Sequence, residues 1–138
     1  MKYLELLGRI FYASIFLKAA PGIFTTKAIG FTAGHGVPLA PALVPLAGAL
    51  ALGGGLSVAL GCKARYGAWM LVGFLLPVTP LMHDYWNLAD AAQRQLREAF
   101  FLRNVAFLGS ALVIAYFGAG PVSVDGWLAS SSRGSASA

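Results

Sequence analysis

Long apolar stretches alternate with short polar connections along this chain. No Asp, Glu, Lys or Arg occurs between Lys27 and Lys63, and further uncharged stretches cover residues 66–82 and 104–124. A membrane-spanning helix takes about 20 predominantly apolar residues. Together with the apolar N-terminus, the pattern predicts four membrane-spanning helices, at about residues 3–20, 41–61, 66–85 and 99–117.

The first predicted span carries charged residues. Glu5 and Arg9 are four positions apart, so they lie on one helical face, and Lys18 lies near the far end, where its side chain can reach the membrane surface. A cleaved signal peptide is the rival interpretation. It fits less well, because Lys2 is the single basic residue before the apolar stretch and the acidic Glu5 follows it.

The connections differ in character. Pro21-Gly22 should end the first helix, and residues 23–40 resemble an interfacial or re-entrant connection. Residues 87–98 are amphipathic, which predicts a short helix on the membrane surface. The fold class is therefore all-α: an antiparallel, integral membrane four-helix bundle with a short interfacial helix between the third and fourth spans. Residues 1–126 form this domain, and the Ser/Ala/Gly-rich residues 127–138 are expected to be a disordered tail.

Small residues and prolines predict how the spans pack. Gly48, Ala51, Gly55 and Ala59 recur at helical spacing, a stripe that allows close approach of a neighbouring backbone. Pro77 and Pro80 each remove a backbone hydrogen bond from the third span, which predicts a kink there.

Composition supports a membrane protein and excludes other classes. The chain is 58% hydrophobic and 11% charged, against about 25% charged residues in soluble domains. The net charge of +5 arises at helix ends, without the aromatic-basic alternation that nucleic-acid binding needs. Basic residues divide evenly between the two sides, and the basic Lys63 and Arg65 turn favours cytoplasmic termini. The lone Cys62 excludes an intrachain disulfide.

Polar side chains of mixed chemistry converge where the first and third spans end and the fourth begins. They are Lys18, His35, His83, Asp84, Trp86, Arg103 and Asn104. Two interpretations stay open. In one, these residues are interface anchors with a structural Asp84–Arg103 ion pair. In the other, His83, Asp84, Trp86, Arg103 and Asn104 bind the headgroup of a quinone. Haem ligation by the two histidines is disfavoured because they lack a spacing signal, and no metal site is predicted.

The opposite side gathers a second polar group, formed by Glu5, Arg9, Arg65, Ser123 and Asp125. A basic residue inside a span needs a partner. We therefore expect Arg9 to form a structural ion pair with Glu5 or Asp125, joining the first and last helices.

Three short segments resemble the DoxX family. They are His83-Asp84-Tyr85-Trp86 at the end of the third span, residues 101–106 at the start of the fourth, and residues 117–125 after it. The resemblance implies a four-helix bacterial inner-membrane protein. It also implies a link to quinone-coupled sulfur oxidation or oxidative-stress complexes. Two positions depart from the family pattern: Ala51 stands where an acidic residue is common, and Arg103 stands where lysine is usual.

The leading hypothesis is a membrane subunit of a quinone-linked redox or oxidative-stress complex. The chain carries no self-contained catalytic motif, so no catalytic residue is assigned, and the expected ligand is a non-covalently bound quinone. The alternative is a non-catalytic membrane scaffold or assembly factor. Both imply contact with the lipid bilayer and with a protein partner or a second copy of the chain. Solute transport is the weaker third option.

Overall fold

The computed structural model describes residues 2–135, and this part of the chain is helical, without strands. Its elements are α1 (Lys2–Ile23), α2 (Thr26–Gly34), α3 (Ala40–Leu60), α4 (Ala64–Met82), the 3-10 turn η1 (Tyr85–Asn87), α5 (Ala91–Phe117) and α6 (Val124–Ser135). Four of them, α1, α3, α5 and α4 extended through η1, are long and apolar enough to cross a membrane. The predicted all-α fold with four spans is confirmed.

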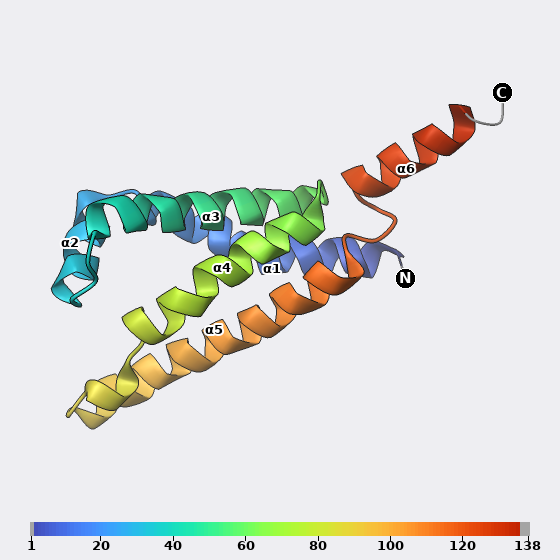
Figure 1. The fold of residues 1–138 in the computed structure, drawn as a ribbon. Helices are drawn as coiled ribbons and strands as arrows, with labels where there is room; N and C mark the ends of the chain where they lie inside the picture. Colours follow the sequence, from blue (N-terminus) through green and yellow to red (C-terminus); the bar gives the residue numbers. More distant parts are fainter. Residues whose placement is uncertain (1, 136–138) are drawn as a thin grey trace.

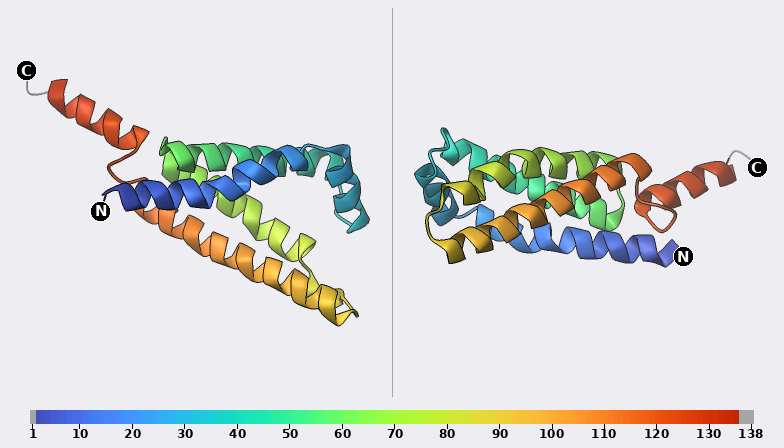
Figure 2. Two further views of the ribbon diagram at one scale, coloured as in Figure 1. Left: turned by 180° about the vertical axis from the view of Figure 1, so that it is seen from behind. Right: turned by 90° about the horizontal axis from the view of Figure 1, so that it is seen from below.

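The long helices pack mainly against their neighbours in the sequence, α1 on α3, α3 on α4, and α4 on α5. Helices α4 and α5 run side by side and diverge from α3, so that the bundle opens as a V (Figures 1 and 2). The open side holds α2 and η1 and is called the α2 end. The other side holds the start of α1, the α3–α4 turn and α6, and is called the α6 end (Figure 1).

Aromatic rings hold α1 against α4 and α5. The Phe16 ring, 4% exposed, meets the rings of Phe74 and Phe107 edge-on, with centroids 6.2 Å and 5.9 Å apart. The hydroxyl of Tyr12 donates to the Phe107 carbonyl at 3.0 Å. Such edge-on ring pairs contribute about 0.5–1.5 kcal/mol beyond area burial. Phe16 is thus a centre of the core, with Leu71 and the other fully buried side chains around it.

The glycines of α3 are used for packing inside the bundle. A Cβ added at Gly48 would lie 2.8 Å from the Phe24 ring, and one at Gly55 would lie 3.1 Å from Leu17. On the opposite face, a Cβ at Gly54 would lie 2.8 Å from the carbonyl oxygen of Gly67 in α4. Gly48 and Gly55 of the predicted small-residue stripe therefore serve contacts of α3 with residues 16–24, whereas Gly54, outside that stripe, serves the contact with α4.

Side chains cap several helix ends. The carboxylate of Asp125 accepts from the backbone N–H of Lys63 at 2.8 Å and of Ala64 at 3.3 Å, which satisfies the start of α4. Thr25 caps α2 through the N–H of Ala28. Lys63 itself has a left-handed backbone, with φ 48°, so the α3–α4 turn is sharp.

Three boundaries differ from the sequence prediction. The amphipathic residues 87–98 form no separate surface helix, because Asp90 caps α5 through the N–H of Gln93 at 2.9 Å and no proline interrupts Ala91–Phe117. Helix α1 continues past Pro21 to Ile23. The connection after it contains the nine-residue helix α2.

The tail also differs from its prediction. Helix α6 extends to Ser135 where a disordered segment was expected, and residues 136–138 of that predicted tail lie outside the described residues. Within α6, serine hydroxyls donate to backbone carbonyls of the preceding turn. The hydroxyl of Ser130, for example, donates to the Trp127 carbonyl at 2.7 Å.

A methyl group added at Gly54 should destabilise the bundle. In Gly54→Ala the new carbon would press on the backbone of Gly67 and on Leu71, both 2.8 Å away, and overpacking costs about 1–3 kcal/mol. Gly109→Ala is the matched control, since nothing lies within 4 Å of its Cβ position. Unfolding free energies in detergent micelles measure both. Equal stabilities of the two variants would contradict the packing described.

Candidate functional site

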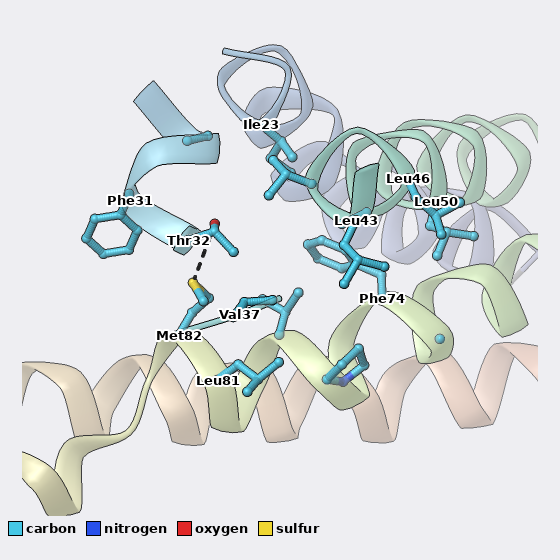
Figure 3. Close-up of a pocket in the computed structure, with 16 residues that line it drawn as sticks. Ile23, Phe31, Thr32, Val37, Leu43, Leu46, Leu50, Phe74, Leu81 and Met82 are labelled. Carbon is cyan, nitrogen blue, oxygen red and sulfur yellow. Dashed lines mark hydrogen bonds between the residues drawn. The ribbon is translucent and has the colours of Figure 1, made fainter. Parts of the chain in front are cut away.

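An apolar cavity of about 340 Å³ lies at the open mouth of the V, between α2, α3 and α4. Figure 3 shows side chains from the three helices around it. Leu43, Leu46 and Leu50 come from α3, whereas Phe74 and Leu81 come from α4. Its walls are almost entirely hydrocarbon, so the cavity suits an apolar chain or ring.

Helix α2 forms the outer wall of this cavity. The hydroxyl of Thr32 points to the sulfur of Met82 at 4.0 Å, a weak contact between α2 and the end of α4 (Figure 3). Phe31 also lines the cavity. None of the residues of α2 is fully buried, so a thin layer of side chains separates the cavity from its surroundings.

A second pocket of about 290 Å³ adjoins the first. The two share Phe31 and Met82 as lining residues, and the second adds the polar side chains of His83, Gln93 and Arg97. Apolar and polar linings therefore meet at the Phe31–Met82 boundary. The combination of an apolar slot with a few polar groups at one end is typical of small-molecule sites.

The end of α4 positions His83. Its backbone N–H bonds the carbonyl of Thr79 at 3.1 Å, and its ring meets the Phe100 ring edge-on with centroids 5.8 Å apart. The guanidinium of Arg103 stacks on Phe100 at 4.8 Å and on Phe107 at 6.0 Å. Arg103 thus contacts a ring beside His83 and lines neither pocket.

The acidic residue of the group has a different partner from the one predicted. Asp84 pairs with Arg97 at 3.0 Å, with both side chains about a quarter exposed, and accepts from the Asn87 amide at 3.0 Å. The predicted Asp84–Arg103 ion pair is therefore wrong. The two arginines are six positions apart in α5, or roughly 9 Å along the helix, and Arg97 is the one that reaches Asp84, just before η1.

The remaining predicted residues do not join the pocket. Trp86 is 54% exposed and packs on Tyr85 and Phe101. Asn104 is 6% exposed and lies seven residues before the buried Ala111, on the core-facing side of α5. Of the five predicted ligand-binding residues, His83 is the one that lines a pocket.

His35 packs at the end of α2, against Phe31 one turn earlier. The Nδ1 atom of His35 lies 2.9 Å from the Phe31 carbonyl, and its ring packs on the Phe31 ring. Lys18 is exposed. Among the residues searched, those the structure describes, no group of three or more His, Cys, Asp or Glu is arranged to hold a metal ion.

Sequence reasoning missed two parts of this site. Arg97 lies in the amphipathic stretch that was predicted to lie on the membrane surface. A basic residue there is expected to face water, so the sequence did not indicate that Arg97 lines a pocket. Phe31 lies in the connection at residues 23–40, where the sequence analysis predicted no helix and the structure has α2. The Thr25 cap followed by an apolar face was the available signal for α2.

The polar residues at the α6 end also have partners other than those predicted. Arg9, 4% exposed, donates to the carbonyls of Val58 at 3.2 Å and Val122 at 2.5 Å. It forms no ion pair with Glu5 or Asp125, because the Arg97–Asp84 pair is the one found among the described side chains. Arg9 still joins α1 to α3 and to the segment after α5, through backbone carbonyls.

Residues 4–84 match the DoxX family. The matched part covers more than half of the chain, from α1 through α4 to the His83-Asp84 pair, and leaves out α5. No curated protein and no solved structure gives a significant match.

A double-mutant cycle should assign the partner of Asp84. Asp84→Ala and Arg97→Ala are expected to be coupled by about 0.5–1 kcal/mol in unfolding free energy, the upper part of the range for surface ion pairs, and added salt should reduce the coupling. The same cycle with Arg103→Ala is the control and should give a coupling near zero. Coupling to Arg103 in place of Arg97 would contradict the arrangement described.

Proposed function

The chain belongs to the DoxX family, and on that premise we propose that this membrane protein is a subunit of a quinone-linked redox or oxidative-stress complex. It binds the quinone at the α2 end. The tail of the quinone occupies the apolar cavity, and its ring lies near Phe31 and Met82 with its oxygens toward His83 and Arg97.

The shared lining of the two pockets carries this proposal. An apolar space of about 340 Å³ meets one of about 290 Å³ that contains an imidazole and a guanidinium, and the two share lining residues. A quinone combines a hydrocarbon tail with two carbonyl acceptors, so it needs this pairing of linings. A lipid tail alone would need no polar group at the boundary.

The charges near His83 favour an acceptor ligand. Arg103, Arg97 and Asp84 all interact electrostatically with His83. The Asp84 carboxylate pairs with Arg97 and accepts from Asn87, so these groups leave one positive charge in excess. The polar pocket therefore offers donors and positive charge. Carbonyl oxygens that gain negative charge on reduction are stabilised by such groups.

The roles of the chain's own residues follow from this placement. A bound quinone accepts two electrons and two protons. His83 can hold and pass a proton, Arg97 orients an oxygen by hydrogen bonding, and α2 excludes water from the apolar part. The electrons come from a partner subunit in this proposal, since the chain has a single cysteine and no motif for a redox centre.

The scaffold alternative loses one of its supports. It depended on a small-residue stripe free to receive a partner helix, whereas Gly48 and Gly55 meet Phe24 and Leu17 of the same chain. A bacterial inner-membrane location, cytoplasmic termini and a protein partner or second copy remain part of the proposal.

Filling the apolar cavity should block the quinone. Gly73 lines the cavity and has nothing within 4 Å of its Cβ position, so Gly73→Leu adds a side chain without a backbone clash. We expect binding of a benzoquinone with a ten-carbon tail to weaken about ten-fold, in line with overpacking costs of about 1–3 kcal/mol. Gly109→Leu is the control, because Gly109 is equally uncrowded and lines none of the pockets described. Unchanged affinity in Gly73→Leu would overturn the cavity assignment.

The polar pocket has a separate test. His83→Ala should weaken binding of the same quinone roughly two- to twelve-fold, the loss of one hydrogen bond, and should lower quinone-dependent electron transfer by the complex. Trp86→Ala is the control, since Trp86 lies outside both pockets. Normal transfer in His83→Ala, with the complex intact in the membrane, would instead favour the scaffold alternative.

A further inference from the structure

A third pocket, of about 420 Å³, lies at the α6 end, far from the cavity at the α2 end. One wall is the start of α4, with Lys63, Arg65 and Tyr66. The other wall is the turn after α5, residues 117–120, together with Asp125 and Gly126. In Figure 1 the α3–α4 turn and the start of α6 lie at this same end.

The lining of the pocket carries net positive charge, from Lys63 and Arg65 against Asp125. Lys63 and Arg65 are both exposed, and neither forms an ion pair among the side chains that the structure describes. Asp125 is the acidic lining residue, but its two carboxylate oxygens accept from the backbone N–H groups of Lys63 and Ala64. The Glu5 carboxylate also lies against Gly120 of the lining. Among the described side chains neither carboxylate forms an ion pair with Lys63 or Arg65, so the two cations are available to an anion.

Backbone geometry sets the position of Arg65. Gly118 has a φ of 84°, and a Cβ there would lie 3.3 Å from the Nε atom of Arg65. Glycine thus lets the guanidinium lie against the turn after α5. A planar guanidinium presents its donors as a fork, which suits phosphate oxygens.

The pocket lies at the depth of lipid headgroups. It is formed by the turn between two helices long and apolar enough to cross a membrane, Ala40–Leu60 and Ala64–Asn87, so a bilayer that covers both helices places the pocket near its headgroups. The aromatic side chains around it are outward-facing, with Tyr66 73%, Phe117 73% and Trp127 67% exposed. Exposed aromatic rings of this kind mark the membrane–water interface.

We propose that this pocket binds the phosphate-bearing headgroup of an anionic phospholipid. Lys63 and Arg65 hold the phosphate, Tyr66 and Phe117 contact the glycerol and upper acyl region, and the Asp125 carboxylate keeps the α3–α4 turn in shape. The site is separate from the proposed quinone site and stands or falls independently of it.

Lipid binding by the purified protein in neutral detergent tests this. Phosphatidylglycerol and phosphatidylcholine of equal acyl length are titrated, and bound lipids are counted by native mass spectrometry. We expect a preference for phosphatidylglycerol that falls about five-fold for each lost charge, in Lys63→Asn and in Arg65→Gln. Asn is chosen at position 63 because it tolerates a left-handed backbone.

The control removes two positive charges from the α2 end, in Lys27→Gln with Arg94→Gln, and should keep the preference. Equal losses in both sets would show general surface attraction and overturn the proposal.

Inorganic phosphate in excess distinguishes the source of the anion: it lacks acyl chains and should not displace the lipid. Phosphate binding without any preference for phosphatidylglycerol would also overturn the proposal. If either pocket variant misfolds, Arg65→Lys, which keeps the charge, should retain most of the preference, and its loss would count against the proposal.

Discussion

The close approach of α3 and α4 near their shared turn is the contact on which the rest of the bundle depends. No side chain separates Gly54 from Gly67, and Leu71 packs on the same surface. Because the turn is short and capped by Asp125, the two helices are held together there and diverge away from it (Figure 1). The divergence opens the apolar cavity at the α2 end, so one backbone contact sets the width of a site at the opposite side of the bundle.

The bilayer explains where the polar groups lie. Lipid offers no hydrogen-bond partner, so charged side chains gather at the two ends of the spans. Arg9, at the α6 end, is buried, with 4% of its surface exposed, and its two terminal nitrogens donate to the carbonyls of Val58 and Val122. Those carbonyls lie at the end of α3 and in the turn after α5. A charge that is costly in lipid thus becomes a tether between three segments distant in sequence.

Sequence patterns predicted the four spans well, because hydropathy and length follow directly from the thickness of the bilayer. They failed where tertiary partners decide the outcome. Spacing could not distinguish Arg97 from Arg103 as the partner of Asp84, nor carbonyls from carboxylates as partners of Arg9. His83 was predicted from its place at a helix end and lines a pocket. The cavity itself depends on the angle between helices, which no local pattern encodes.

The two ends of the bundle have different chemistry, an apolar cavity with donors at the α2 end and a basic headgroup-level pocket at the α6 end. The proposed quinone site lies at the first of these ends. Photolabelling of the protein in native membranes with an azido-quinone, followed by mapping of the labelled peptide, tests it most directly. The account predicts labels within residues 28–50 and 73–83, around Phe31 and Met82. Labels confined to the outward faces of α1 or α5 would contradict it. A protein that stays unlabelled when the azido-quinone saturates the membrane would also contradict it.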